Sequence, residues 1–182
     1  MRGPSLETRL DFLSDFQLKR LNIEFGFMLH CSERCRWLVE IAVFLLDTNI
    51  CIAALKGNPK VQAKLSQYAG RIYLNVIVLA ELQFGVEKQA LLAQAHSKTT
   101  PYNRTLLKRF IDTTDGVLAM DIATTQVYAA IRAKHEKKGV VTGPHDLWIA
   151  AHAIQLGAVL VTANSREFDC IPGLRSQNWL DG

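Results

Sequence analysis

The sequence lacks any long apolar run. No stretch of its 182 residues approaches the roughly 20 consecutive apolar residues that a helix needs to span a bilayer. The first twenty residues have no continuous apolar segment and contain several acids, which excludes a secretory signal peptide. We therefore expect a cytoplasmic protein with no membrane segment and no membrane partner.

Cysteine is scarce, and glycine-rich turns are missing where a nucleotide site would need them. The four cysteines are Cys31, Cys35, Cys51 and Cys170. They are too few for a disulfide scaffold in a chain of this size, so we expect reduced thiols. His30, Cys31 and Cys35 have the spacing of half a zinc site, but no second ligand pair accompanies them. No glycine-rich turn follows the first predicted strand, which disfavours a dinucleotide enzyme.

The composition that is present is typical of a globular protein. The chain is 49% hydrophobic and 21% charged, and its length suits one domain with a substantial core. Residues 1–42 contain six basic and six acidic residues, whereas residues 43–182 contain fifteen and eleven. The net charge of +4 therefore lies entirely after residue 42. A basic surface around an acidic pocket suits a polyanionic partner such as RNA.

The two parts of the chain also differ in pattern. Residues 1–42 have loosely spaced apolar residues without a clean helical stripe, whereas strand and helix alternate from Val43 onward. We predict an N-terminal extension over 1–42 and a compact domain over 43–182. We also expect the natural protein to start at or near Val43, because a valine codon of the GTG type can serve as a bacterial start. A peptide from residues 10–36, detected by mass spectrometry of the native protein, would contradict this expectation.

Repeated alternation of strand and helix predicts an α/β fold with a mostly parallel sheet and helices on both faces. Apolar runs predict strands over 41–46, 71–76, 117–120 and 158–162, and a short strand in the tail 172–179. Helical spacing and end signals predict helices over 50–55, 59–68, 77–93, 94–110 with a break near 99–101, 122–138 and 145–156. The prediction is a three-layer α/β/α domain whose central sheet has four to five strands.

Four acidic residues occur at informative places in this pattern. Asp47 directly follows the first apolar run, and Glu167 follows the fourth predicted strand by a few residues. Glu81 lies within an apolar helix, and Asp146 lies in the first turn of another helix, where the helix dipole favours a carboxylate. Each acid alone is explained equally well as a helix cap, a solvated position or a surface turn. Together they are expected at one edge of the sheet, beyond the carboxyl ends of its strands.

Clustered carboxylates predict a divalent cation. They repel one another and raise one another's pKa unless a cation neutralises them. Ligands that are all oxygen favour Mg²⁺ or Mn²⁺, and no His or Cys accompanies these acids at zinc-like spacing. Such a cation lowers the pKa of water, which is the usual nucleophile in phosphodiester hydrolysis.

Several motifs carry a resemblance to a known family. They are Phe44-Leu-Leu-Asp47-Thr48-Asn49, Ala80-Glu81-Leu82-x2-Gly85, Gly143-Pro-His-Asp146-Leu-Trp-Ile-Ala-Ala-His152 and Val161-Thr162-Ala-Asn164-Ser-Arg-Glu167-Phe168, with the closing Pro172-Gly-Leu174…Asn178-Trp179. In this order, from Val43 to Trp179, the chain resembles PIN-domain ribonuclease toxins of the VapC type. The extension over 1–42 departs from that family.

The resemblance implies a PIN-like fold and a Mg²⁺- or Mn²⁺-dependent endoribonuclease that inhibits translation by cleaving tRNA or ribosomal RNA. It also implies a cognate VapB-like antitoxin as partner and a homodimer. Carried over by position, the catalytic, metal-binding acids are Asp47, Glu81, Asp146 and, as a more variable fourth, Glu167. The supporting residues are Thr48, Asn49, Thr162 and Asn164.

Alternative interpretations remain beside this one. In the first alternative, the domain is a catalytically silent PIN module that holds RNA. In the second, it is a phosphatase or dehalogenase with Asp47 as nucleophile. The second alternative is disfavoured because the position two residues on is Asn49 rather than an acid. Arg166, in the loop that carries Glu167, is the candidate for a contact with an RNA phosphate. His152 is expected to be packed inside rather than catalytic.

Overall fold

The computed structural model describes residues 42–92, 99–140 and 142–181, which belong to the unit Ala42–Gly182. The predictions for residues 1–41 lie outside the described residues. These are the N-terminal extension, the start site and the incomplete zinc pattern at His30, Cys31 and Cys35.

Five parallel strands form one sheet in the order β3-β2-β1-β4-β5. From the centre outward they are β1 (Phe44–Leu46), β2 (Ile72–Asn75), β4 (Val159–Val161), β3 (Val117–Leu118) and β5 (Arg175–Gln177). Every residue of β1, β2 and β4 is buried, as expected for parallel strands covered on both faces. The predicted sheet of four to five strands is confirmed, although its strands are shorter than predicted.

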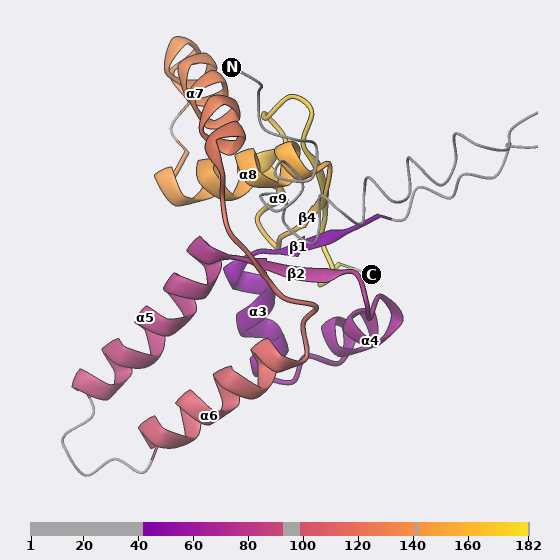
Figure 1. Cartoon of the computed structure of the whole chain (residues 1–182), viewed down its shortest axis with the longest axis vertical. Coiled ribbons are helices and arrows are strands. Elements are labelled where there is room, and N and C mark those ends of the chain that lie inside the picture. Colours follow the sequence, from indigo (N-terminus) through magenta and orange to yellow (C-terminus); the bar gives the residue numbers. More distant parts are fainter. Residues whose placement is uncertain (1–41, 93–98, 141, 182) are drawn as a thin grey trace, which may run out of the picture. The chain divides into compact units, whose positions relative to one another are not determined.

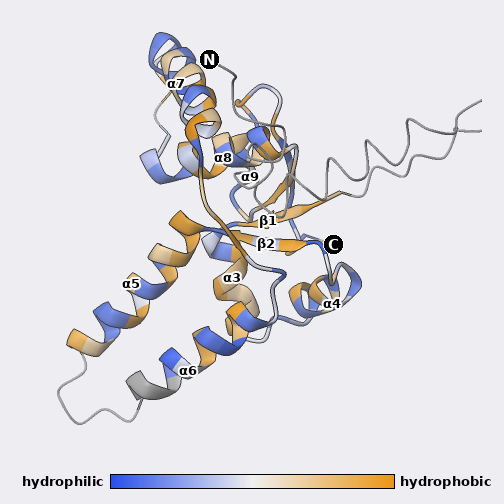
Figure 2. Ribbon diagram, viewed as in Figure 1, coloured by the Kyte–Doolittle hydropathy of each residue, from blue (hydrophilic) through white to orange (hydrophobic). Residues whose placement is uncertain are grey.

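Helices cover both faces of this sheet. They are α3 (Thr48–Leu55), α4 (Pro59–Gln67), α5 (Val76–Leu92), α6 (Thr99–Asp112), α7 (Ile122–Lys138), α8 (Pro144–Leu156) and α9 (Ser165–Phe168). In Figure 1, α3, α4 and α6 lie on one side of β1 and β2, and α7 and α8 lie on the other side. Figure 2 shows β1 and β2 in the hydrophobic colour between these layers. The three-layer α/β/α arrangement therefore matches the prediction.

Two local predictions were wrong. Residues 99–101, which were predicted to interrupt a helix, instead form the first turn of α6. Proline is tolerated there because the first N–H groups of a helix have no partner within the helix. The segment predicted as a loop around Glu167 contains the short helix α9.

The sequence also sets the ends of α7 and the start of α8, the helix that carries Asp146. The Asp121 side chain caps α7 by accepting a hydrogen bond of 2.9 Å from the Thr124 backbone N–H. Gly139 ends α7 with a φ of 66°, a left-handed conformation that favours glycine. Pro144 then opens α8 at its first helical position. The connection is short, and it brings the first turn of α8 to the carboxyl edge of the sheet.

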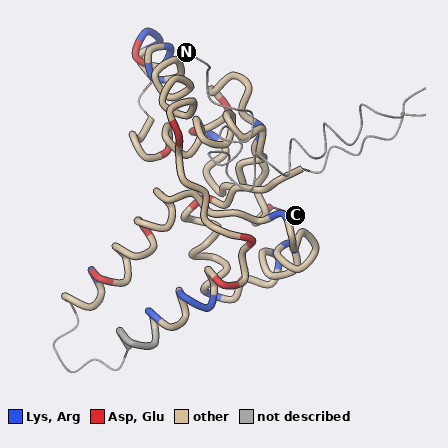
Figure 3. Tube along the Cα trace, in the orientation of Figure 1, with Lys and Arg blue, Asp and Glu red and all other residues tan. Residues whose placement is uncertain are grey.

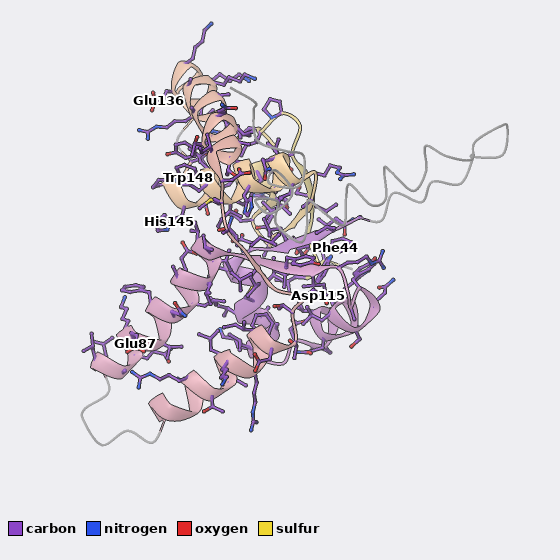
Figure 4. The ribbon with its side chains drawn as sticks, in the orientation of Figure 1. Phe44, Glu87, Asp115, Glu136, His145 and Trp148 are labelled. Carbon is purple, nitrogen blue, oxygen red and sulfur yellow. The ribbon has the colours of Figure 1, made fainter. Side chains whose placement is uncertain are left out.

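Aromatic packing closes the opposite end of β1. The Phe44 ring lies 4.4 Å from the Tyr68 ring and 5.5 Å from the Trp179 ring, measured between centroids. Trp179 is buried, so it is a core residue. Figure 4 labels Phe44 in this region. The amino end of β1 is thus apolar and packed, whereas its carboxyl end continues directly into polar residues.

Candidate active site

Asp47 begins where β1 ends, and it is held firmly there. Its backbone N–H donates to the Val161 carbonyl on β4 at 2.9 Å, and the residue is only 5% exposed. Oδ1 accepts a hydrogen bond of 2.7 Å from the Thr48 backbone N–H. Oδ2 accepts from Asn49 Nδ2 at 2.7 Å and from Thr162 Oγ1 at 2.6 Å. Three donors therefore fix the orientation of this carboxylate.

Asn49 and Thr162 tie the ends of β1 and β4 together. Asn49 Oδ1 accepts from the Ala163 backbone N–H at 3.0 Å, and Asn49 Nδ2 also lies 3.2 Å from Thr162 Oγ1. Thr162 Oγ1 accepts from the Asn164 backbone N–H at 3.0 Å. Asn164 thus contributes through its backbone, and its exposed side chain forms no cap on α9. Of the predicted supporting residues, Asn49 and Thr162 contact Asp47 directly through their side chains.

Glu81 reaches the same edge from α5. The Thr48 hydroxyl donates to Glu81 Oε2, and His145 Nδ1 lies 2.7 Å from Glu81 Oε1. The Glu81 side chain is 30% exposed and that of His145 is 61% exposed. In Figure 4, His145 lies at the beginning of α8, on the side toward α5. The His145 contact joins the two helices that carry Glu81 and Asp146.

Asp146 differs from the other acids in its surroundings. It is only partly buried, and no described residue forms a hydrogen bond with its carboxylate. Burial raises its pKa from 3.8 to about 6, and the negative charges of Asp47, Glu167 and Glu81 add to the increase, which His145 opposes. The structure thus brings Asp47, Glu81 and Glu167 within electrostatic range of Asp146.

Burial also raises the pKa of Asp47. Its hydrogen bonds to Thr162, Thr48 and Asn49 counteract the increase, whereas the nearby Glu81 charge adds to it. Ionising Asp47 and Asp146 at this edge therefore costs more free energy in the folded state than it would in water. A bound cation would reverse that cost.

The donor chemistry of this edge fits a hard divalent cation. Its side chains offer carboxylate oxygens, which Mg²⁺ and Mn²⁺ prefer. In the described ranges, no three His, Cys, Asp or Glu side chains are arranged as a ready metal-binding group. The fit therefore rests on the oxygen donors and on their mutual repulsion, which a cation would relieve.

The short helix α9 carries Glu167 and Arg166, both exposed. The Glu167 backbone N–H donates to the Asn164 carbonyl at 3.1 Å, which places the acid one turn beyond β4. Arg166 forms no hydrogen bond or ion pair with another described residue. Its guanidinium is therefore available to an anion from solution.

Two buried polar residues, Asn75 and His152, pair behind the site. Asn75, at the end of β2, is fully buried, and its Oδ1 accepts from the Ile77 backbone N–H at 2.6 Å. Its Nδ2 lies 2.8 Å from Nδ1 of His152, which is 1% exposed. Burial lowers the pKa of His152 to about 4, so the ring is neutral at pH 7. As predicted, His152 is packed inside. The only sequence feature that could have indicated the role of Asn75 is its position as a polar residue at the end of a strand.

The contact of His145 with Glu81 was also missed. Its one sequence signal was the position of His145 next to Asp146. Trp148, one turn further along α8, stacks on Tyr128 of α7 with ring centroids 3.9 Å apart and planes inclined by 9°. That ring face is therefore covered by the domain itself.

Other features of the surface lie outside this constellation. A hollow of about 440 Å³ between α5 and α6 is lined by none of the predicted site residues but by Gln83, Val86, Glu87, Arg104, Leu107, Lys108 and Ile111. Figure 3 shows Lys and Arg along α6 and at the end of α7. Among the helices that the structure describes, none is both long and apolar enough to cross a membrane.

Comparisons with known proteins agree over most of the described domain. The family model of the PIN domain matches residues 44–174. The tRNA(fMet)-specific endonuclease VapC of Shigella flexneri is 35% identical over 137 residues, which cover 75% of this chain and 97% of that protein. Ribonuclease VapC2 of Rickettsia felis is 36% identical over 140 residues, which cover 75% of this chain and 98% of that protein.

A solved structure gives the same result. In the crystal structure of VapBC2 from Rickettsia felis bound to a DNA fragment from their promoter, one chain superimposes with a TM-score of 0.67 at 36% identity. The superposition covers 75% of this chain and 98% of that chain. The similarity therefore extends over nearly the full length of these relatives.

Proposed function

This chain belongs to the PIN-domain family as a toxin of the VapC type, and from that premise we propose a Mg²⁺- or Mn²⁺-dependent endoribonuclease that inhibits translation. The family membership confirms the PIN-like fold. The observation that carries the proposed chemistry is the electrostatic coupling of Asp47, Glu81 and Glu167 to Asp146, whose pKa is about 6. Such a cluster of acids is stable in its charged form when a cation balances it.

Asp47, Glu81 and Asp146 would hold the cation, with Glu167 as a fourth acid. When bound, a divalent cation supplies positive charge to the phosphate and a water of lowered pKa as nucleophile. The three donors on Asp47 keep its carboxylate in place. His145 and Thr48 orient the two oxygens of Glu81. Asp146 must lose its proton to join them, so we expect the affinity of the metal-free protein for the cation to fall as the pH drops through about 6.

The remaining parts of the chain suggest how RNA is held. Arg166 lies one residue before Glu167 and is free to pair with a phosphate oxygen. Lys137 and Lys138 at the end of α7 add positive charge to the surface. We propose tRNA as the first substrate to test, because a relative at 35% identity is named a tRNA(fMet)-specific endonuclease. Ribosomal RNA is the other candidate.

We also propose a VapB-like antitoxin as partner, a homodimer as the assembly and the cytoplasm as the location. The antitoxin is supported by the similarity to a chain of the VapBC2 complex. An antitoxin that offers an arginine to the acidic edge would suit its negative charge. We further propose that the functional domain spans residues 43–182 and that residues 1–42 are an N-terminal extension.

The test is RNA cleavage by the purified full-length protein. We expect cleavage products with Mg²⁺ or Mn²⁺, none in EDTA, and none from Asp47→Ala or Asp146→Asn with either cation. Asp112→Asn is the matched control, because Asp112 is an exposed acid at the end of α6 and should leave cleavage intact. RNA that is retarded in a gel but never cleaved would instead favour the catalytically silent module. Cleavage by the Asp146→Asn variant would contradict the proposal.

A further inference from the structure

Gly143, the residue that precedes α8, is a glycine without a backbone reason to be one. Its φ of −55° and ψ of 140° are accessible to every amino acid. They are also the angles that the following Pro144 favours in the residue before it. A hydrogen bond from a side chain at this N-cap position would help the helix, and glycine provides none. The glycine must therefore be explained by something other than backbone conformation.

Space explains it. A methyl group added at Gly143 would lie 2.5 Å from Oδ2 of Asp146 and 3.4 Å from its Cγ. The first distance is far below a van der Waals contact, so the Asp146 carboxylate occupies the volume that any side chain at Gly143 would need. Asp146 lies three residues into the chain after the cap, and its side chain folds back over the helix start. A side chain at residue 143 and the present position of the Asp146 carboxylate are therefore incompatible.

The local structure decides which of the two would move. The Gly143 carbonyl accepts the first hydrogen bond of α8, from the Leu147 N–H at 3.0 Å. On its other side, Thr142 Oγ1 lies 3.1 Å from Nδ1 of His135, which is 3% exposed. The backbone at Gly143 is thus held from both sides, whereas no described residue holds the Asp146 carboxylate by a hydrogen bond. The carboxylate would give way.

We propose that Gly143 is a positioning residue for Asp146: its missing side chain lets the Asp146 carboxylate fold back into the cluster with Asp47, Glu81 and Glu167. This inference rests on the proposed function, because it concerns how the cation site is assembled. A methyl group at Gly143 would displace the carboxylate by about 1 Å, a misplacement large enough to reduce the performance of a ligand site by an order of magnitude or more.

The test is Mn²⁺ binding by the full-length protein without RNA, measured by isothermal titration calorimetry. Gly143→Ala should lower the Mn²⁺ affinity tenfold or more while the midpoint of thermal unfolding in EDTA stays the same or rises. Gly85→Ala is the matched control, because Gly85 lies in α5 and an added methyl group would meet no atom within 4 Å beyond the adjoining backbone of its own helix and its two chain neighbours. It should bind Mn²⁺ like the wild type. Equal affinity in Gly143→Ala and the wild type would overturn the inference.

A second comparison separates positioning from a general structural effect. In an Asp146→Ala background, Gly143→Ala should cause no further loss of Mn²⁺ affinity, because the group that it displaces is absent. A full additional loss there would contradict action through Asp146. A wild type that binds no Mn²⁺ would instead contradict the proposed function itself, and a wild type that binds while Gly143→Ala is unaffected would contradict only this inference.

Discussion

Asp47 and Asp146 lie at the same edge of the sheet, yet the chain holds them in opposite ways. Asp47 is buried, follows the central strand directly and accepts hydrogen bonds from three donors. Asp146 is partly exposed at a helix start, and no described residue donates to it. The first carboxylate is part of the fold, and the second is available to a ligand. Removing each should therefore affect activity alike and stability differently.

The largest expected effect comes from Asp47→Ala. Activity should be lost. The Thr162 hydroxyl loses its acceptor at a buried site, and Asn49 Nδ2 keeps only Thr162 Oγ1. Each unsatisfied group costs about 1–3 kcal/mol, so we expect the free energy of unfolding to fall by about that much or more. Urea denaturation followed by circular dichroism measures it. A variant as stable as the wild type would show that the hydrogen bonds to Asp47 do not support the fold.

Asp146→Asn should also abolish cleavage but should stabilise the metal-free protein. Because its pKa is raised from 3.8 to about 6, ionising Asp146 costs more free energy in the folded state than in the unfolded state. Allowing for screening at this partly exposed position, we expect a gain of about 1–2 kcal/mol in EDTA. The same denaturation experiment tests it at pH 7. A loss of stability would mean that Asp146 is structural after all.

The pH dependence of stability should expose two opposing titrations. Asp146 has its pKa raised from 3.8 to about 6 on folding, so its contribution is complete below pH 4 and is lost as the pH rises through 6. His152 has its pKa lowered from 6.5 to about 4, so its contribution is complete above pH 6.5 and is lost as the pH falls to 4. In metal-free wild type the two effects oppose each other.

Asp146→Asn removes one of these titrations. The free energy of unfolding should then rise more steeply from pH 4 to 6.5 in the variant than in the wild type, and thermal unfolding across that range measures it. Identical slopes in the two proteins would show that Asp146 does not titrate as described.

The smallest effect is expected from His145→Ala. His145 is exposed and contacts one oxygen of Glu81, whose other oxygen is still held by Thr48. An exposed pair of this kind contributes little to stability, about 0–1 kcal/mol, so unfolding should be nearly unchanged. Cleavage should fall only a few-fold. A loss as large as that of Asp146→Asn would assign His145 a direct part in the reaction.

The sequence predicted Asp47 for a physical reason that also explains what it missed. An apolar run that ends in Asp, Thr and Asn marks a strand end, and parallel topology sends such ends to one edge. Two of the donors to Asp47, Thr48 and Asn49, follow it directly in the chain. The third, Thr162, lies 115 residues away, and only the pairing of β1 with β4 brings it to Asp47. Local patterns carry no information about such contacts.

The same limit applies to Glu81 and Gly143. The contact of Glu81 with His145 spans 64 residues and depends on where α5 and α8 cross. Gly143 reads in the sequence as an ordinary glycine before a helix, and its clash with Asp146 becomes visible only from the direction of that side chain. Short elements such as α9 and the exact strand ends also depend on packing rather than on local preference.

The proposed divalent cation would relieve the repulsion that Asp146 experiences. The most direct measurement is the midpoint of thermal unfolding at pH 7 as Mg²⁺ or Mn²⁺ is titrated into the metal-free wild type and Asp146→Asn. Binding to the folded state alone raises that midpoint. We expect the midpoint to rise with cation concentration in the wild type and to rise little or not at all in Asp146→Asn. Equal rises in both proteins, or none in the wild type, would contradict this expectation.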